Sequence, residues 1–211
     1  MSSTIKVARN PGDLVDAPAG FFKTLFVGTA RADGLQVQHS HRMVLKEYAA
    51  FIDVKTRCVN PTIKFVHTLK NAGKPVGGSY QRAKFNSTEP GADIISFNTY
   101  ELYMPTLAAH EYLHCYTHQN FINAVYGNAS SLSPASQRKV IEGSTTYLTR
   151  KTPVSRAGDP FFVINRSYGN YVKFIKKVVH DIGEDTLKKA YLSGDPKSIE
   201  RFFRAVHRYD I

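Results

Sequence analysis

The interpretation of this chain depends on one stretch, which reads Leu107-Ala108-Ala109-His110-Glu111-Tyr112-Leu113-His114-Cys115-Tyr116. Apolar residues recur around it at a helical spacing, and this pattern predicts a helix from about Thr106 to Asn120. Residues four positions apart lie on the same face of a helix, so His110 and His114 can direct their imidazoles at one point. The stretch therefore predicts a metal site on a helix.

The residue types in this stretch suit a catalytic zinc ion. Neutral imidazole is a good zinc ligand, and a catalytic zinc takes three protein ligands and leaves a fourth position for water. Zinc lowers the pKa of that water towards 7 and polarises a carbonyl. Glu111 lies one step round the helix from His110, which is too far for a ligand but suits a general base that takes the proton from the water. A surface helix that carries two histidines by chance is the alternative interpretation.

A third ligand has to come from another part of the chain, and Glu142 is the best candidate. Ser133-Pro134 is a typical helix start, with serine as the N-cap and proline at the first helical position. The helix is expected to run to about Arg150. Gly143 follows the glutamate and would let this helix approach the motif helix closely. An ordinary exposed carboxylate is the alternative for Glu142.

Other histidines and the cysteines have several interpretations. His118 lies one helical turn beyond the motif, where it could support the site or contact substrate, although a polar helix-end histidine is favoured. His39 and His41 would share one face of an extended strand, so a second metal is conceivable, but a solvated pair is favoured. Cys58 and Cys115 cannot be assigned to a disulfide without geometry, and for Cys115 a buried thiol is the ordinary interpretation.

The whole chain indicates an α+β fold, mixed at the front and helical behind. Residues 1–20 are rich in turn formers and read as a loose lead-in, while 21–211 is expected to form a single domain, because 211 residues suit one well-packed core. The other expected elements are a strand at 21–27 closed by Gly28, a helix at 43–54, a loop or hairpin at 71–91, a strand at 92–97, and helices at 168–179, at 184–192 and from 195 onward.

Composition bounds the partners. The chain has 28 Lys and Arg against 17 Asp and Glu, a net charge of +11, which favours anionic partners or simply gives a basic soluble surface. It has no CxxC pair, helix-turn-helix signature or aromatic RNA-binding motif, so nucleic acid is an unexpected partner. No stretch approaches the 18 or more apolar residues that a membrane span needs, and residues 1–6 lack the apolar core of a secretory signal.

Two runs of the chain, Leu107–His114 and Ile141–Tyr147, resemble the gluzincin branch of zinc metallopeptidases. The stretch Gly183–Asp195 is also similar to the tail of zincin domains in bacterial polymorphic toxins and secreted effectors, so the resemblance covers about residues 92–195. It implies a zincin-like fold with a small N-terminal sheet, an active-site helix and a helical C-terminal half. The ligands of Zn2+ that it implies are His110, His114 and Glu142.

The resemblance also implies a function and a setting. The chain would be a metallopeptidase that hydrolyses peptide bonds in a protein or peptide substrate. It would be secreted by a specialised bacterial system without a classical signal peptide, as an effector or toxin domain, or remain cytoplasmic until delivery. An immunity protein or a component of the secretion system is then an expected partner.

The chain departs from the resembled pattern at one position and leaves another open. Many gluzincins carry an aspartate four residues after the third ligand to orient a zinc histidine, whereas this chain has Thr146, which holds a ring less firmly. Arg166 and Tyr168 resemble the arginine and tyrosine of clostridial-neurotoxin-like zinc proteases. Tyr168 is the nominated catalytic donor to the developing oxyanion, and Tyr147 is the other choice.

Two other functions stay open at this point. A zinc amidase that acts on cell-wall peptide would use the same metal site, and a basic surface would suit its anionic polymer. A non-enzymatic basic module that binds nucleic acid would need zinc only for structure, or not at all.

Overall fold

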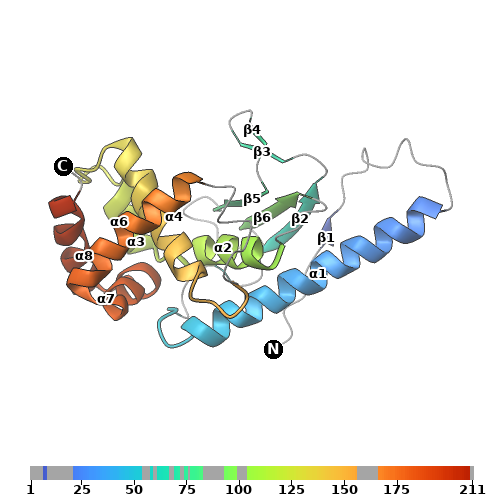
Figure 1. Ribbon diagram of the computed structural model, residues 1–211, viewed down its shortest axis with the longest axis horizontal. Coiled ribbons are helices and arrows are strands. Elements are labelled where there is room, and N and C mark those ends of the chain that lie inside the picture. Colours follow the sequence, from blue (N-terminus) through green and yellow to red (C-terminus); the bar gives the residue numbers. More distant parts are fainter. Residues whose placement is uncertain are drawn as a thin grey trace.

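The computed structural model describes residues 7–8, 21–53, 58, 61–66, 69–71, 74–75, 77–82, 93–98, 104–155 and 166–209. The fold is α+β, as predicted, and mostly helical (Figure 1). Its helices are α1 Phe21–Tyr48, α2 Met104–Tyr116, α3 Gln119–Tyr126, α4 Pro134–Thr149, α6 Arg166–Ile182, α7 Glu184–Lys188, the π-helical turn η2 Lys189–Ser193 and α8 Pro196–Tyr209. Its strands are β1 Val7–Ala8, β2 Thr62–Val66, β3 Lys70–Asn71, β4 Lys74–Pro75, β5 Gly78–Gln81 and β6 Ile94–Asn98.

The main sheet has the strand order β1-β2-β6-β5. β1, β2 and β6 are parallel, and β5 runs antiparallel to β6 at the end of the order. Alternate residues of β2 and β6 are buried, since successive side chains of a strand point to opposite faces. Ile63 pairs with Ile95 and Phe65 with Phe97, so the buried face is a two-strand apolar ladder.

The helix α2 lies in the middle of the molecule. Figure 1 shows the sheet on one side of it and the C-terminal helices α4, α6, α7 and α8 on the other, with α1 running along its length. Almost every residue of α2 from Thr106 to Tyr116 is buried, including Leu113, which is wholly inaccessible. A helix that is covered on all sides holds its polar side chains in fixed positions, because few rotamers are open to them.

The expected strand at 21–27 is wrong, and the helix expected at 43–54 begins much earlier. Residues 21–27 and 43–48 belong to the single helix α1, which passes through Gly28 and Gly34 and ends at Tyr48, before the expected end at 54. From Val37 onward its buried residues recur at helical spacing, with Val44 and Tyr48 following on the same face. Burial of this face against α2 outweighs the strand propensity of the apolar start and the roughly 1 kcal/mol cost of each internal glycine.

The strands between α1 and α2 were also only partly predicted. The sequence indicated a loop or hairpin at 71–91, and the structure has a hairpin of β3 and β4 followed by β5. The strand β2 was missed, whereas the strand predicted at 92–97 is β6. Val7–Ala8 forms β1, and the rest of the expected lead-in at 1–20 lies outside the described residues.

The predicted helices of the second half are present. Ser133 caps α4 by accepting a hydrogen bond from the backbone N–H of Ser136, and Asp195 caps α8 by accepting one from Ser198 at 2.8 Å. Gly194 ends η2 in the left-handed conformation, with φ of 65°, where glycine is favoured. The single helix expected at 106–120 is instead α2 and α3, divided at His118.

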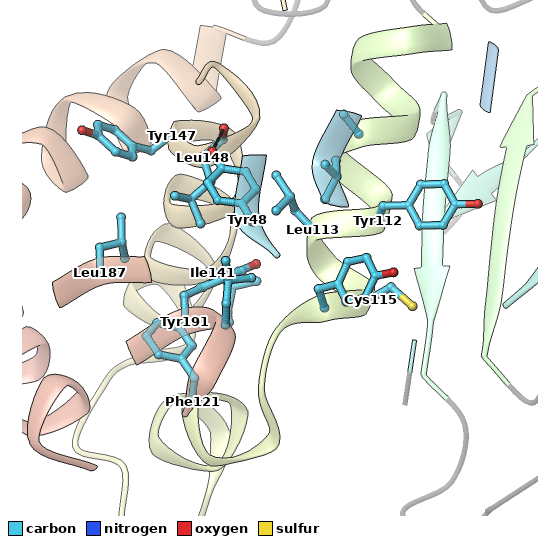
Figure 2. Close-up of a cluster of buried hydrophobic side chains, with 14 of the residues drawn as sticks. Tyr48, Tyr112, Leu113, Cys115, Phe121, Ile141, Tyr147, Leu148, Leu187 and Tyr191 are labelled. Carbon is cyan, nitrogen blue, oxygen red and sulfur yellow. Dashed lines mark hydrogen bonds between the residues drawn. The ribbon is translucent and has the colours of Figure 1, made fainter. Parts of the chain in front are cut away.

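One covalent link was not assigned from the sequence. Cys58 and Cys115 form a disulfide with a Cα–Cα distance of 5.4 Å, so the interpretation of Cys115 as a free buried thiol is wrong. The bond joins the C-terminal end of α2 to the segment before β2. Figure 2 shows Cys115 in the buried cluster beside Leu113, and Tyr48 of α1 lying near Leu148 of α4.

None of the described helices is long and apolar enough to cross a membrane.

Candidate metal centre

Three side chains from two helices converge at one point. His110 and His114 come from α2, and Glu142 comes from α4. Nε2 of His110 lies 3.1 Å from Nε2 of His114, and Oε2 of Glu142 lies 3.3 Å from the first nitrogen and 3.4 Å from the second. Within the described part of the chain, this is the one cluster of His, Cys, Asp and Glu side chains arranged to hold a metal ion.

The size of this triangle fits a tetrahedral metal. Bonds of about 2.0–2.1 Å separate neighbouring ligand atoms of a tetrahedron by about 3.3 Å, and the observed sides of 3.1, 3.3 and 3.4 Å bracket that value. Oε2 of Glu142 is buried, and apart from its contacts with the two histidine nitrogens it accepts no hydrogen bond from the described residues. A buried carboxylate oxygen is costly unless hydrogen bonds or a cation satisfy it. The donor atoms therefore fit a bound metal ion.

The protonation of His110 and Glu142 suits metal binding, whereas His114 must lose a proton. Burial lowers the pKa of His110, which keeps the ring neutral. Burial alone would raise the pKa of Glu142, but the two histidines lower it well below its usual value, so the group is a carboxylate. Burial would lower the pKa of His114, but Glu142 and Glu111 raise it. A metal that binds there displaces the proton.

Two threonines of α4 support the far side of the imidazole rings. Oγ1 of Thr145 lies 3.3 Å from Nδ1 of His114, and Oγ1 of Thr149 lies 3.5 Å from Nδ1 of His110. Each hydroxyl donates its own proton, at 2.8 Å, to the carbonyl four residues earlier. Each can therefore only accept from a ring N–H. This arrangement places the ring proton on Nδ1 and leaves the lone pair of Nε2 for a metal.

Thr146, the residue considered for this orienting role, does not have it. Its Oγ1 is buried and makes no hydrogen bond to the described residues. Thr145 and Thr149 were missed, although they follow Glu142 by three and seven positions and so share its helix face. That spacing is a signal from which they could have been found.

Gly143 also differs in its role from the expectation. A Cβ at this position would lie 2.8 Å from Cγ1 of Ile175 and 2.9 Å from the carbonyl oxygen of Tyr171. Both belong to α6, so the glycine permits close approach of α4 to α6 and not to the motif helix. The consequence for the site is indirect: α6 carries Tyr168 and is held near α4.

Glu111 lies beside the metal ligands. It is only 5% exposed, and burial raises its pKa to about 7, with a smaller opposing effect of His114 and a reinforcing one of Glu142. A Cβ placed on Gly78 of β5 would lie 3.0 Å from Oε1 of Glu111. The edge strand β5 therefore passes directly against the carboxylate of Glu111.

Tyr168 reaches the same place from α6. Its ring lies 5.8 Å from that of His110, centre to centre, in a stacked orientation. Burial most strongly, and then Glu142 and Glu111, raise the pKa of its hydroxyl. Tyr147, the other nominated tyrosine, donates to Glu184 at 2.9 Å. Five residues past Glu142 it lies on another side of α4, so it is not part of this group.

Two further histidines, His41 and His118, have structural roles. His41 lies on α1 and not on a strand, its Nε2 is 2.6 Å from the hydroxyl of Tyr116, and its ring stacks on Tyr112 at 4.2 Å. Burial lowers its pKa to about 4. His39 is an exposed residue of the same helix. His118 caps α3 and lies 3.4 Å from Asp53, which confirms the interpretation as a polar helix-end histidine.

Comparison of the chain with protein-family models, with curated proteins and with solved structures gives no match. The group of His110, His114 and Glu142 could bind a metal ion. The functional conclusion rests on this group and on its surroundings.

Proposed function

We propose that this chain is a zinc-dependent metallopeptidase with a zincin-like fold. His110, His114 and Glu142 hold the metal, and Glu111 is the general base. The observation that carries the proposal is the set of three ligand atoms whose separations fit a tetrahedral metal, with the buried carboxylate of Glu111 beside them. A metal group without an adjacent acid would suit a structural ion equally well, so Glu111 is the residue that favours catalysis.

The ligand set supports zinc. Two imidazole nitrogens and one carboxylate oxygen are the donors of one common class of catalytic zinc site, which has three protein ligands and one open position. Magnesium and calcium prefer oxygen donors in larger number. The triangle matches tetrahedral geometry, whereas the octahedral preference of magnesium would demand more ligands than the group supplies.

Each residue has a defined task in peptide hydrolysis. When bound, zinc supplies Lewis acidity, which acidifies water and polarises a carbonyl. Glu111 takes a proton from the attacking water and returns it to the leaving nitrogen. Tyr168 donates its hydroxyl hydrogen to the oxygen on which negative charge develops. The position of its ring against His110 supports this role.

The position of β5 supports an extended peptide as substrate. Among the described strands, β5 is paired only with β6, so its other edge is free of a strand partner. A peptide that adds to such an edge gains main-chain hydrogen bonds. The strand before the motif helix, β6, lies between β2 and β5 and so offers no open edge to a peptide. Since Gly78 of β5 is against Glu111, a peptide on β5 would lie next to the general base.

The biological setting is part of the same proposal. We propose a secreted bacterial effector or toxin domain, with an immunity protein or a secretion component as partner. The disulfide Cys58–Cys115 supports a destination outside the reducing cytoplasm, because such bonds persist in oxidising compartments.

The test combines metal content with cleavage. We expect the purified protein to contain about one zinc per chain and His110→Ala to lose it, while His180→Ala, at an 88% exposed side chain, retains it. Glu111→Gln should keep the zinc and lose cleavage of an unfolded protein substrate. Glu200→Gln, at a 69% exposed carboxylate, should keep both.

Three results would contradict the proposal. Wild-type protein that takes up no zinc even when it is supplied would remove the metal site. Full cleavage by Glu111→Gln would remove its role as the general base. Digestion of cell-wall peptide without cleavage of protein substrates would mean that the site belongs to a zinc amidase and not to a peptidase of proteins.

A further inference from the structure

We propose that Tyr191 is a positioning residue of the metal centre, which acts on His114 through Thr145. The inference rests on the proposed metal site, but not on the reaction proposed for it. Tyr191 belongs to the turn η2, far from the ligands in sequence, and its side chain is fully buried. Nothing in the motif Glu142 to Thr146 or in the histidine spacing points to it.

The contacts form a continuous chain of hydrogen bonds. The hydroxyl of Tyr191 lies 2.5 Å from Oγ1 of Thr145, which lies 3.3 Å from Nδ1 of His114. Oγ1 of Thr145 also lies 2.8 Å from the carbonyl oxygen of Ile141. A threonine hydroxyl has one proton and two lone pairs. Because the carbonyl can only accept, the proton goes to Ile141, and the two lone pairs receive the hydroxyl of Tyr191 and the N–H of His114.

The consequence concerns the ring of His114. Because both lone pairs of Thr145 Oγ1 accept hydrogen bonds, the oxygen is held in one orientation, in which it faces Nδ1 of His114. A ring whose Nδ1 keeps the proton presents the lone pair of Nε2 to the metal. Hydrogen bonds in such a chain also polarise one another, so the bond from Tyr191 strengthens the acceptor that His114 uses.

Tyr191 is itself held firmly. Its backbone carbonyl accepts the N–H of His118, the N-cap of α3, at 2.8 Å. Its ring packs edge-on against Phe121 at 5.1 Å, and Figure 2 shows the two side chains together below Ile141. The next turn closes at Gly194, where a Cβ would clash with the ring of His118. The π-helical turn therefore holds Tyr191 against the start of α3, which follows the motif helix, and directs its hydroxyl to Thr145 of α4. Such turns occur frequently at functional sites.

The support of the two histidines is unequal. His110 is backed by Thr149 at the longer distance of 3.5 Å, and Thr149 donates to the carbonyl of Thr145. Among the described residues, no tyrosine hydroxyl is hydrogen-bonded to Oγ1 of Thr149. Loss of the Tyr191 hydroxyl should therefore weaken the metal through His114 alone, with the other two ligands unchanged.

The experiment measures zinc affinity by competition with a chromogenic chelator. Removal of an outer partner of a metal histidine typically weakens affinity by roughly 10–100-fold. We expect Thr145→Val to fall in this range, Tyr191→Phe to bind about 10-fold more weakly than wild type, and Thr145→Ser to bind like wild type. The double variant Thr145→Val/Tyr191→Phe should be no weaker than Thr145→Val, since both act through one contact.

The matched control is Tyr48→Phe. Tyr48 is also fully buried, and its hydroxyl donates at 2.7 Å to the carbonyl of Leu148, with no ligand involved. This variant should lose thermal stability like Tyr191→Phe and keep wild-type zinc affinity. The visible spectrum of the cobalt-substituted protein should change in Tyr191→Phe and not in Tyr48→Phe.

The outcomes separate the two proposals. Wild-type affinity in Tyr191→Phe, or an equal loss in Tyr48→Phe, overturns the positioning role. Wild-type protein that binds no zinc overturns it as well. The expected affinity pattern in a protein that cleaves no peptide would support the role of Tyr191 and overturn the peptidase.

Discussion

Gly78→Ala tests the position of Glu111 without touching a ligand. The new Cβ would lie 3.0 Å from Oε1 of Glu111, 3.0 Å from Cδ1 of Leu107 and 3.1 Å from Cγ of Glu111. Ordinary van der Waals contacts of a Cβ begin at 3.4 Å. The Glu111 carboxylate, the Leu107 side chain or the strand β5 must therefore move by about 0.4 Å. Because the new Cβ is too close to both Glu111 and Leu107, a shift of one of these side chains alone does not relieve both contacts.

The expected effect follows from this displacement. Overpacking a buried contact costs about 1–3 kcal/mol of unfolding free energy, and we expect the lower end because β5 is at the end of the sheet. A displacement of about 1 Å at a catalytic group can cost 100-fold in rate. We therefore expect kcat/KM for peptide cleavage to fall by about 10-fold or more. Zinc affinity should stay at the wild-type value, because the three atoms nearest to the new Cβ belong to Glu111 and Leu107 and not to a ligand.

The assay is cleavage of a quenched fluorescent peptide, with zinc content and thermal unfolding measured on the same samples. Gly34→Ala is the matched control: a Cβ there meets nothing within 4 Å, and in the helix α1 it should stabilise the protein by about 0.5–1 kcal/mol. Wild-type kcat/KM in a folded, zinc-loaded Gly78→Ala would refute the reasoning, since Glu111 could not then be the base in the position observed.

Three further predictions concern stability. Replacement of Cys58 and Cys115 by serine opens a loop with a sequence separation of 57 residues, and urea unfolding should show a loss of about 4 kcal/mol; an unchanged midpoint would mean that the bond does not constrain the unfolded chain. Partial burial would raise the pKa of Glu184, but hydrogen bonds from Lys188, Lys151 and Tyr147 lower it to about 2 from 4.5. A depressed pKa stabilises the fold above the unfolded value, so the stability difference between wild type and Glu184→Gln should persist from pH 7 to about 5 and vanish between about 4.5 and 2 in pH-dependent unfolding. Finally, chelation of the metal should lower Tm in calorimetry, by the equivalent of about 4 kcal/mol where free zinc had been about 1,000 times Kd, and His110→Ala should show no such shift.

Local patterns made much of this protein predictable. The spacing of His110 and His114 places both rings on one helix face whatever surrounds the helix, because the geometry of an α-helix is set within a few residues. The caps Ser133 and Asp195 mark helix starts for the same reason, since their hydrogen bonds reach only the next turn. Glu142 was identified through its own helix, although its distance to the histidines depends on how α4 and α2 pack.

Tertiary structure decided what depends on contacts between distant segments. The start of α1 has strand propensity, yet burial of Val37, Val44 and Tyr48 beside α2 makes the whole segment a helix. The disulfide required two cysteines to meet, and no spacing rule could show that. Gly78 meets Glu111 only because β5 passes over α2.

The same division applies to the centre itself. The spacing of the residues alone predicts the two candidate ligands on α2 and the acid between them, since these residues are neighbours on one helix. Only the folded chain placed Thr145 behind His114 and Tyr191 behind Thr145. Hydrogen bonds act over about 3 Å, and bringing three separate helical segments within that distance is a result of core packing, which no local pattern encodes.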